Sequence, residues 1–157
     1  MKPANLKVKT RLERFGLEFE IRILPNAVRT AILAAEALDC AVGQIANSLI
    51  FRDKASAQAV LVMCAGDRLV DLKKVKLATG IELGKADADF VRQQSGFAIG
   101  GVPPVAHVNQ LHTILDISLQ RHTTIWAAAG TPESVFCMSP QQLQEITAGA
   151  WLDIAQC

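Results

Sequence analysis

Two apolar runs of strand length lie near the middle of the chain, and they constrain the fold more than any other feature. They are residues 45–51, IANSLIF, and residues 59–66, AVLVMCAG, separated by the polar segment RDKASAQ. Apolar runs around a short polar segment are typical of two strands joined by a turn. The sequence therefore predicts a hairpin buried on at least one face, with the polar pair Asn47 and Ser48 inside its first strand.

The segment before this hairpin changes its periodicity. Residues 17–24, LEFEIRIL, alternate apolar and charged side chains, which predicts a half-buried strand. After Pro25, residues 27–40 carry an apolar stripe at helical spacing, and Asn26 is a candidate cap for that helix. The stripe consists of Val28, Ala31, Ile32, Ala35 and Leu38.

The rest of the chain mixes short helices and short strands. Three helices are marked by a capping residue before them and a glycine after them: Asp71 and Gly80, Asp87 and Gly96, and Ser139 and Gly149. Residues 112–119, 123–130 and 134–138 have strand character. Because no regular βαβ period appears, we expect a mixed α+β fold: one domain over 1–157 with a strongly curved, barrel-like sheet surrounded by short helices.

Composition supports a globular chain. Half of the 157 residues are hydrophobic, a fifth are charged, and tyrosine is absent, so the core should be mainly aliphatic. The N-terminal residues lack the apolar segment of a signal peptide, and no apolar run is long enough to span a bilayer. We therefore expect a cytoplasmic protein with no membrane partner.

Cysteine and histidine spacing argues against a metal centre. Cys40, Cys64, Cys137 and Cys157 form no CxxC pair, and the three histidines have no ligand-like spacing. We expect reduced thiols, with Cys40 and Cys64 in the core, and neither metal nor cofactor. A catalytic cysteine remains a minor alternative, because sequence alone does not show whether a thiol has a cationic neighbour.

The net charge of +1 does not by itself indicate a nucleic-acid-binding protein. Basic residues nevertheless cluster in the first fourteen residues and again at Arg68, Lys73, Lys74 and Lys76. Each cluster is either a set of phosphate contacts or an ordinary solvated face.

The most unusual segment is GFAIGGVPPVAH, residues 96–107. Glycine permits close approach of another group to the backbone, and proline fixes φ and removes a donor, so covalent geometry shapes this loop. It is either an ordinary connection or a loop that presents its backbone to a ligand.

Four segments together resemble the YbaK/EbsC/ProX family, the free-standing relatives of the editing domain of bacterial prolyl-tRNA synthetases. They are RTAILAAEALDC…GQIANSLIF, VLVMCAGDRLVDLKKV, GFAIGGVPPVAH and AAAGTP, and they cover nearly the whole chain. The resemblance implies a deacylase that hydrolyses the ester of a mischarged tRNA, in the best-known members a proline-type tRNA charged with cysteine or alanine. The implied partners are tRNA and a synthetase.

The resemblance also implies a site. The family's GxxxP loop corresponds to Gly100–Pro104, where backbone amides of Gly100 and Gly101 would hold the ester oxyanion and Val102, Pro103 and Pro104 would shape the loop. Asn47 would be a further catalytic residue, and Ser48 would contact substrate together with Val102, Pro103 and Pro104. Arg68, Lys73 and Lys74 would contact phosphates. On this reading Gly101 should tolerate no side chain, because a Cβ would intrude where the ester carbonyl must reach the backbone amides.

At Asn47 the chain departs from its relatives, whose active members have lysine in the pattern QIxK[ST]L where this chain has QIANSL. An amide still donates and accepts hydrogen bonds, but a charged hydrogen bond is roughly twice as strong as a neutral one. Lys54 or Arg68 could supply the missing cation, or the chemistry could be substrate-assisted. The alternative function is a non-catalytic module that binds an aminoacyl-adenosine-like molecule. Asn47 and Ser48 could also simply satisfy each other in the strand.

Overall fold

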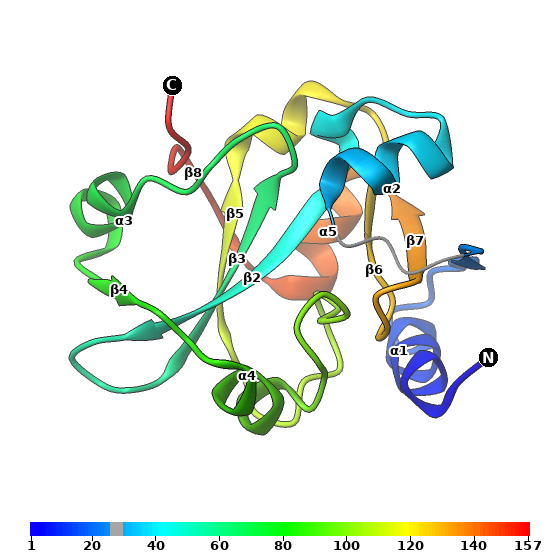
Figure 1. Cartoon of the computed structure of the whole chain (residues 1–157), viewed down its shortest axis with the longest axis horizontal. Coiled ribbons are helices and arrows are strands. Elements are labelled where there is room, and N and C mark those ends of the chain that lie inside the picture. The colour runs from blue at the N-terminus through cyan, green and yellow to red at the C-terminus, as the bar shows by residue number, and fades with distance from the viewer. Residues whose placement is uncertain (26–29) are drawn as a thin grey trace.

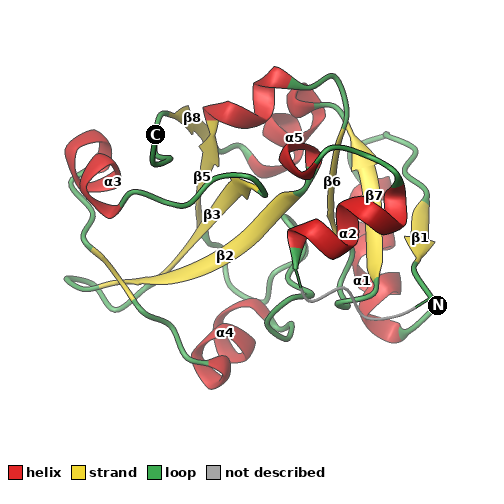
Figure 2. Cartoon of the chain, turned by 45° about the horizontal axis from the view of Figure 1, so that its top comes forward, coloured by secondary structure: helices red, strands yellow, loops and turns green. Residues whose placement is uncertain are grey.

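The computed structural model describes residues 1–25 and 30–157 and confirms the predicted α+β class. A five-stranded sheet has the strand order β4-β2-β3-β5-β8, and a three-stranded sheet has the order β1-β7-β6 (Figures 1 and 2). The two sheets are joined by a parallel bridge between Ile45, the residue before β2, and Trp126 of β6. The strands are β1 (Ile21–Ile23), β2 (Ala46–Asp53), β3 (Ala59–Ala65), β4 (Leu83–Gly84), β5 (His112–Asp116), β6 (Ile125–Ala128), β7 (Ser134–Met138) and β8 (Ala150–Leu152).

Five α-helices and two 3-10 turns surround these sheets in the described residues. Figure 1 shows α3 at one end of the molecule, α1 and α2 toward the other, and α4 below the centre of the larger sheet. None of these helices is long and apolar enough to cross a membrane. Their bounds are α1 (Pro3–Glu13), α2 (Ala31–Leu38), α3 (Leu72–Thr79), α4 (Ala88–Ser95) and α5 (Pro140–Thr147), with the 3-10 turns η1 (Val42–Gln44) and η2 (Ile117–Arg121).

The predicted hairpin is confirmed as β2 and β3, the centre of the larger sheet. The two strands pair antiparallel from Ala46 opposite Ala65 to Arg52 opposite Ala59. Every residue of β3 is buried, because the sheet is covered on both faces. On one face Leu61 and Met63 join the main core, and on the other Val62 and Cys64 join a smaller core.

The predicted caps of the later helices are confirmed. Asp71, Asp87 and Ser139 each accept a backbone amide of the following helix, and Gly80 and Gly96 end their helices in the left-handed conformation. The prediction for Gly149 was wrong by one residue, since Ala148 takes the left-handed position at φ 54°. These signals work because a cap needs only a local hydrogen bond or a local φ value.

Other boundaries differ from the sequence prediction. The strand expected over 17–24 is reduced to the three residues of β1, which pair only with β7. The strands expected over 112–119 and 123–130 are shortened to β5 and β6, and the η2 turn follows β5 directly. The helix expected from residue 27 begins at Ala31, where Thr30 accepts the amide of Leu33 at 3.1 Å. The predicted cap Asn26, together with Val28, lies outside the described residues.

Helix α1 was not predicted, and it supports the turn between β6 and β7. Asn5 is buried, and its Nδ2 donates to the carbonyl of Ala129 at 2.7 Å and lies 2.8 Å from Ser134 Oγ. Ser134 Oγ in turn lies 2.6 Å from Thr131 Oγ1. Since Val8 and Leu12 join the main core, α1 and this turn form one packed unit.

We predict that Asn5→Ala lowers the free energy of unfolding by about 2–3 kcal/mol, because it leaves buried polar partners unsatisfied. Urea unfolding measures this effect. Asn109→Ala is the matched control, since Asn109 is exposed and the one side-chain hydrogen bond that it makes within the described residues, to Gln94, is 3.4 Å long. Equal stability of the two variants would contradict the supporting role of Asn5.

Candidate active site

The loop at residues 96–107 is a tightly folded segment anchored at both ends. Its first turn closes where the amide of Gly101 donates to the carbonyl of Ala98 at 3.0 Å. At its far end, His107 Nε2 lies 2.6 Å from the carbonyl oxygen of Pro103, and burial lowers the pKa of His107. Residues 101–105 are buried, whereas Ile99 and Gly100 are exposed. The loop therefore presents only its tip.

The backbone of Gly101 packs directly against the backbone of the turn between β6 and β7. A Cβ at Gly101 would lie 2.8 Å from the Cα of Thr131 and 2.9 Å from its carbonyl carbon. Backbone atoms of a supported turn move less readily than the end of a side chain. Gly101 therefore excludes a side chain because two backbones meet there, which differs from the predicted reason, access of the ester.

Gly100 has a different constraint. Its φ is +89°, a conformation that suits glycine, and a Cβ there would meet only Pro132, at 3.8 Å. In the described residues the amide of Gly100 donates to no acceptor, whereas the amide of Gly101 already donates to the carbonyl oxygen of Ala98. Of the two predicted oxyanion donors, Gly100 is the one that a ligand can reach.

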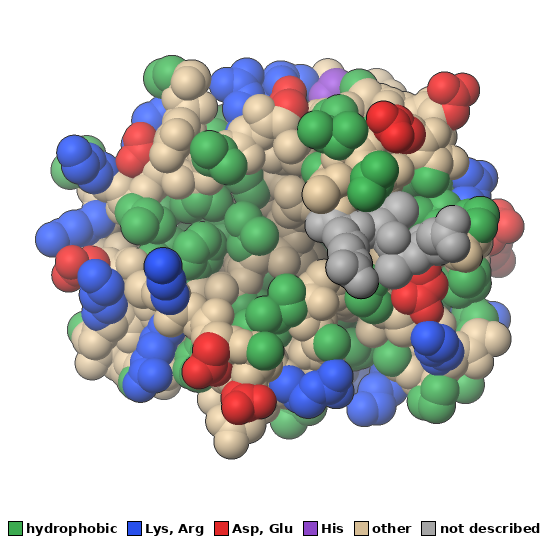
Figure 3. Space-filling model, viewed as in Figure 1, with side chains coloured by type: hydrophobic (Ala, Val, Ile, Leu, Met, Phe, Trp, Pro, Cys, Tyr) green, Lys and Arg blue, Asp and Glu red, His purple; other side chains and the backbone are tan. Residues whose placement is uncertain are grey.

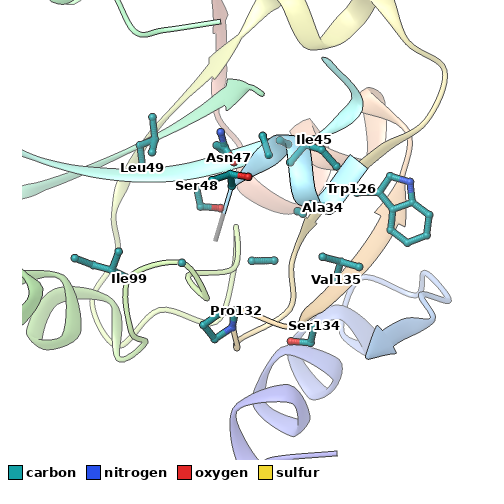
Figure 4. A pocket seen from close by; sticks show the side chains of 16 residues that line it. Ala34, Ile45, Asn47, Ser48, Leu49, Ile99, Trp126, Pro132, Ser134 and Val135 are labelled. Atoms are coloured by element: carbon teal, nitrogen blue, oxygen red, sulfur yellow. The ribbon is translucent and has the colours of Figure 1, made fainter. Parts of the chain in front are cut away.

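A cavity of about 290 Å³ lies beside this loop tip, between β2, the start of α2 and the strands β6 and β7. Asn47, Ser48 and Gly100 all line it, so the structure brings the predicted strand and the predicted loop together (Figure 4). Most of the remaining wall is apolar, and the residues labelled in Figure 4 include Ala34, Ile45, Leu49, Ile99, Trp126, Pro132 and Val135.

Asn47 and Ser48 belong to opposite faces of the sheet, as neighbours on a strand must. Ser48 pairs with Met63 across the hairpin, and its hydroxyl contacts Met63 Sδ at 3.3 Å. Asn47 pairs with Cys64, on the face where Leu49 packs. The two polar side chains therefore do not satisfy each other. Ser48 is on the face of β2 toward the loop, whereas the Asn47 side chain is on the opposite face, at the edge of the cavity (Figure 4).

The polar groups that the described lining offers are all neutral: Thr30, Asn47, Ser48, Ser134, the indole N–H of Trp126 and backbone amides. The hydroxyl of Thr30 already accepts the amide of Leu33 as the cap of α2. The hydroxyl of Ser134 is already hydrogen-bonded to Thr131 and Asn5. Asn47, Ser48 and the Gly100 amide remain for a ligand. Such a site can orient a carbonyl group and stabilise developing negative charge through hydrogen bonds.

The other predicted loop residues shape the surroundings. Gly101, Pro103 and Pro104 do not line this cavity, and Val102 lines a neighbouring one. Pro103 holds His107 through its carbonyl oxygen, as described above. Their contribution is to fix the loop tip in place.

The predicted cations are not among the residues that line the cavity. Lys73 and Lys74 are on α3, which Figures 1 and 2 both show at the opposite end of the larger sheet from β6 and β7. Lys74 contacts Asp153 at 3.1 Å and the carbonyl of Ala155 at 2.7 Å. Neither Arg68 nor Lys54 lines the cavity, and Lys54 lies 3.7 Å from Glu82. In this structure neither of the two contributes a charge to the wall of the cavity.

The thiols differ in burial. Cys64 is buried as predicted, and burial and the neighbouring carboxylate of Asp116 raise its pKa to about 12, which disfavours the nucleophilic thiolate at neutral pH. Cys40 is only half-buried, because it packs at the edge of the cluster around α2. Neither lines the cavity.

Three parts of the site were missed by the sequence analysis. Ile99, Trp126 and Pro132 line the cavity, and Arg22 lies over the Trp126 ring at 5.1 Å. The glycine turn AAAGTP was a visible signal for Pro132. Nothing local marks Trp126, because its place depends on the pairing of two distant strands.

Comparison with known proteins settles the family. The aminoacyl-tRNA editing domain matches residues 25–146, which include both Asn47 and the loop. The chain belongs to the aminoacyl-tRNA editing domain family. A crystal structure of a protein proposed as a trans-editing enzyme for prolyl-tRNA synthetase has a TM-score of 0.93 and 36% identity, covering 100% of this chain and 99% of that one.

Two further proteins are similar to this chain over nearly its whole length. A scaffold-protein structure from epitope backbone grafting by computational design has a TM-score of 0.94 and 34% identity, with both chains covered completely. The uncharacterized protein YwhH of Bacillus subtilis (strain 168) is 29% identical over 150 residues, 95% of each chain. The editing-domain fold thus extends over the chain, and Asn47 and Gly100 meet at one cavity within it.

The two loop glycines should respond differently to alanine. Gly101→Ala should lower the free energy of unfolding by about 2–3 kcal/mol through overpacking. Gly100→Ala should cost only about 1–2 kcal/mol for its positive φ. Gly16→Ala is a control for φ alone, since its φ is +68° and nothing lies within 4 Å of the added carbon. Urea unfolding ranks the three, and a Gly101→Ala variant as stable as Gly16→Ala would refute the backbone contact.

Proposed function

We propose that the protein hydrolyses, in trans, the ester that joins a wrong amino acid to a proline-type tRNA in the cytoplasm. The observation that carries this proposal is the cavity where Asn47 of β2 and the exposed Gly100 meet, in a chain of the editing family. The likeness to the protein proposed as a trans-editing enzyme for prolyl-tRNA synthetase supports the choice of tRNA and of a synthetase as partner.

The proposed reaction consumes one water molecule. Its oxygen attacks the ester carbonyl carbon and forms a tetrahedral oxyanion, the bond to the ribose oxygen breaks, and that oxygen takes a proton as the amino acid leaves. In this proposal the amide of Gly100, which lines the cavity and has no backbone acceptor in the described residues, donates to the oxyanion, and one such donor contributes about 3–4 kcal/mol in a preorganised site.

The attacking water needs a proton acceptor. The described lining contains no histidine or carboxylate. A neighbouring hydroxyl of the terminal ribose is the nearest group that the substrate itself supplies, so we infer substrate-assisted activation. Asn47 and Ser48 would then orient the aminoacyl ester through neutral hydrogen bonds.

The direct test is incubation with proline-type tRNA charged with alanine, cysteine or proline, followed by loss of the ester. Asn47→Ala should lower turnover roughly 10- to 100-fold, the effect of one or two neutral hydrogen bonds. Asn109→Ala should leave the rate unchanged, since Asn109 is not among the residues that line the cavity. Efficient hydrolysis that Asn47→Ala leaves untouched would remove Asn47 from the chemistry.

A second candidate function is a binding module that retains the cavity without catalysis. The observation that favours it is the neutral asparagine at the position of the family's lysine. The same assay separates the two. A parent without activity and an Asn47→Lys variant with activity would support the module.

Binding of tRNA should fall steeply with salt, by a slope of about 0.9 in log K per duplex phosphate contact. Besides Arg68 and Lys73, a second basic group is available to bind phosphates. It consists of Lys7 and Arg11 on α1 and Arg14 just after that helix, and these three residues line a groove together with His107. Replacing Lys73 and Arg68 with glutamine should reduce the slope by about two. If only Lys7→Gln and Arg11→Gln do so, the phosphates lie along α1. A salt-insensitive complex would contradict tRNA as ligand.

A further inference from the structure

A second cavity adjoins the one described above. It measures about 300 Å³, and it shares Ser48, Leu49, Ile99 and Gly100 with the first. Its own wall consists of Ile50, Phe51, Lys85, Ala86, Val91 and Val102. The loop tip with Ile99 and Gly100 thus stands at the junction of two cavities.

The junction leaves an apolar side chain uncovered. Ile99 is 57% exposed although it lines both cavities, and Figure 4 shows its side chain at the open end of the loop below β2. Figure 3 shows hydrophobic side chains gathered mainly left of the centre of the face seen in Figure 1, with charged side chains of both signs around its edge. A ligand that spans the junction would cover Ile99 and remove its surface from water.

Lys85 is the cation of the second cavity, and its backbone is held from both sides. Just before it, Gly84 of β4 pairs with Arg52 of β2. Just after it, Asp87 caps α4 through the amide of Phe90 at 2.8 Å. Lys85 is exposed, and no carboxylate of the described residues lies within 4 Å of its ammonium group.

Lys54 is the natural comparison. It is also an exposed lysine beside β4, and its stem packs against Gly84, where an added Cβ would lie 3.2 Å from Lys54 Cγ. Its ammonium group lies 3.7 Å from Glu82. Lys54 lines neither cavity, so the two lysines share one corner of the sheet but only Lys85 faces a cavity.

We propose that the second cavity holds the terminal nucleoside of the substrate and that Lys85 contacts the 5′-phosphate of that nucleotide. This inference rests on the proposed function. An aminoacyl ester has a small acyl group on one side of its carbonyl and a nucleotide on the other. With the carbonyl at Gly100, the apolar walls at Ile50 and Val91 suit the faces of a base, and the ammonium group suits its phosphate.

The test uses adenosine and adenosine 5′-monophosphate as probes, so it does not require catalysis. The protein should bind the monophosphate about tenfold more tightly than the nucleoside, the effect of one charge-assisted contact at a partly exposed site. Lys85→Met should abolish that preference and Lys85→Arg should keep it. Lys54→Met should leave it unchanged. Methyl NMR shifts at Ile50, Val91 and Ile99 report the location.

Kinetics with mischarged tRNA give the second readout. Lys85→Met should raise KM about tenfold and change kcat less than about twofold, because the phosphate contact exists before and during the reaction. The two proposals fail separately. Three results would each overturn the role of Lys85. They are hydrolysis by Lys85→Met with an unchanged KM, no binding of adenosine 5′-monophosphate to the parent, and a preference for the monophosphate over adenosine that persists in Lys85→Met. Phosphate-dependent binding without hydrolysis would support the second cavity and overturn the deacylase.

Discussion

The close approach of Gly101 to the backbone of Thr131 is the contact on which the site depends. It fixes the loop tip against the turn between β6 and β7, and a side chain at Gly101 would force the two apart. The turn is itself held by Asn5 of α1 through Ala129 and Ser134. A buried polar network at one end of the chain thus sets the position of Gly100, where the two cavities meet.

Strand β2 is the second fixed part of the site, because it forms a wall of both cavities. Its place is determined by the hairpin with β3, whose residues are all buried. At its start the Ile45–Trp126 bridge brings the smaller sheet alongside, and at its end β4 pairs with Arg52 and Asp53. A single strand therefore connects the neutral cavity at Asn47 with the lysine beside β4.

The arrangement separates two kinds of interaction. Near Asn47 the described lining has only neutral groups, and their contribution in the proposed deacylase would be orientation of a carbonyl group and stabilisation of an oxyanion. The positive charge lies at the rim of the neighbouring cavity, at Lys85. In the proposed deacylase, charge would thus serve binding of the nucleotide, while backbone geometry would serve the reacting ester.

The sequence by itself determined the hairpin, the caps at Asp71 and Asp87 and the rigid loop, because each follows from local periodicity, a local hydrogen bond or covalent geometry. It also determined the family, since the editing-domain motifs are long and ordered. It did not show α1, whose buried side includes the polar Asn5. Only the tertiary structure placed Asn47, Trp126 and Gly100 around one cavity and set Lys85 beside a second. Those placements arise from strand pairings and a backbone contact between segments distant in the chain, which no local pattern records.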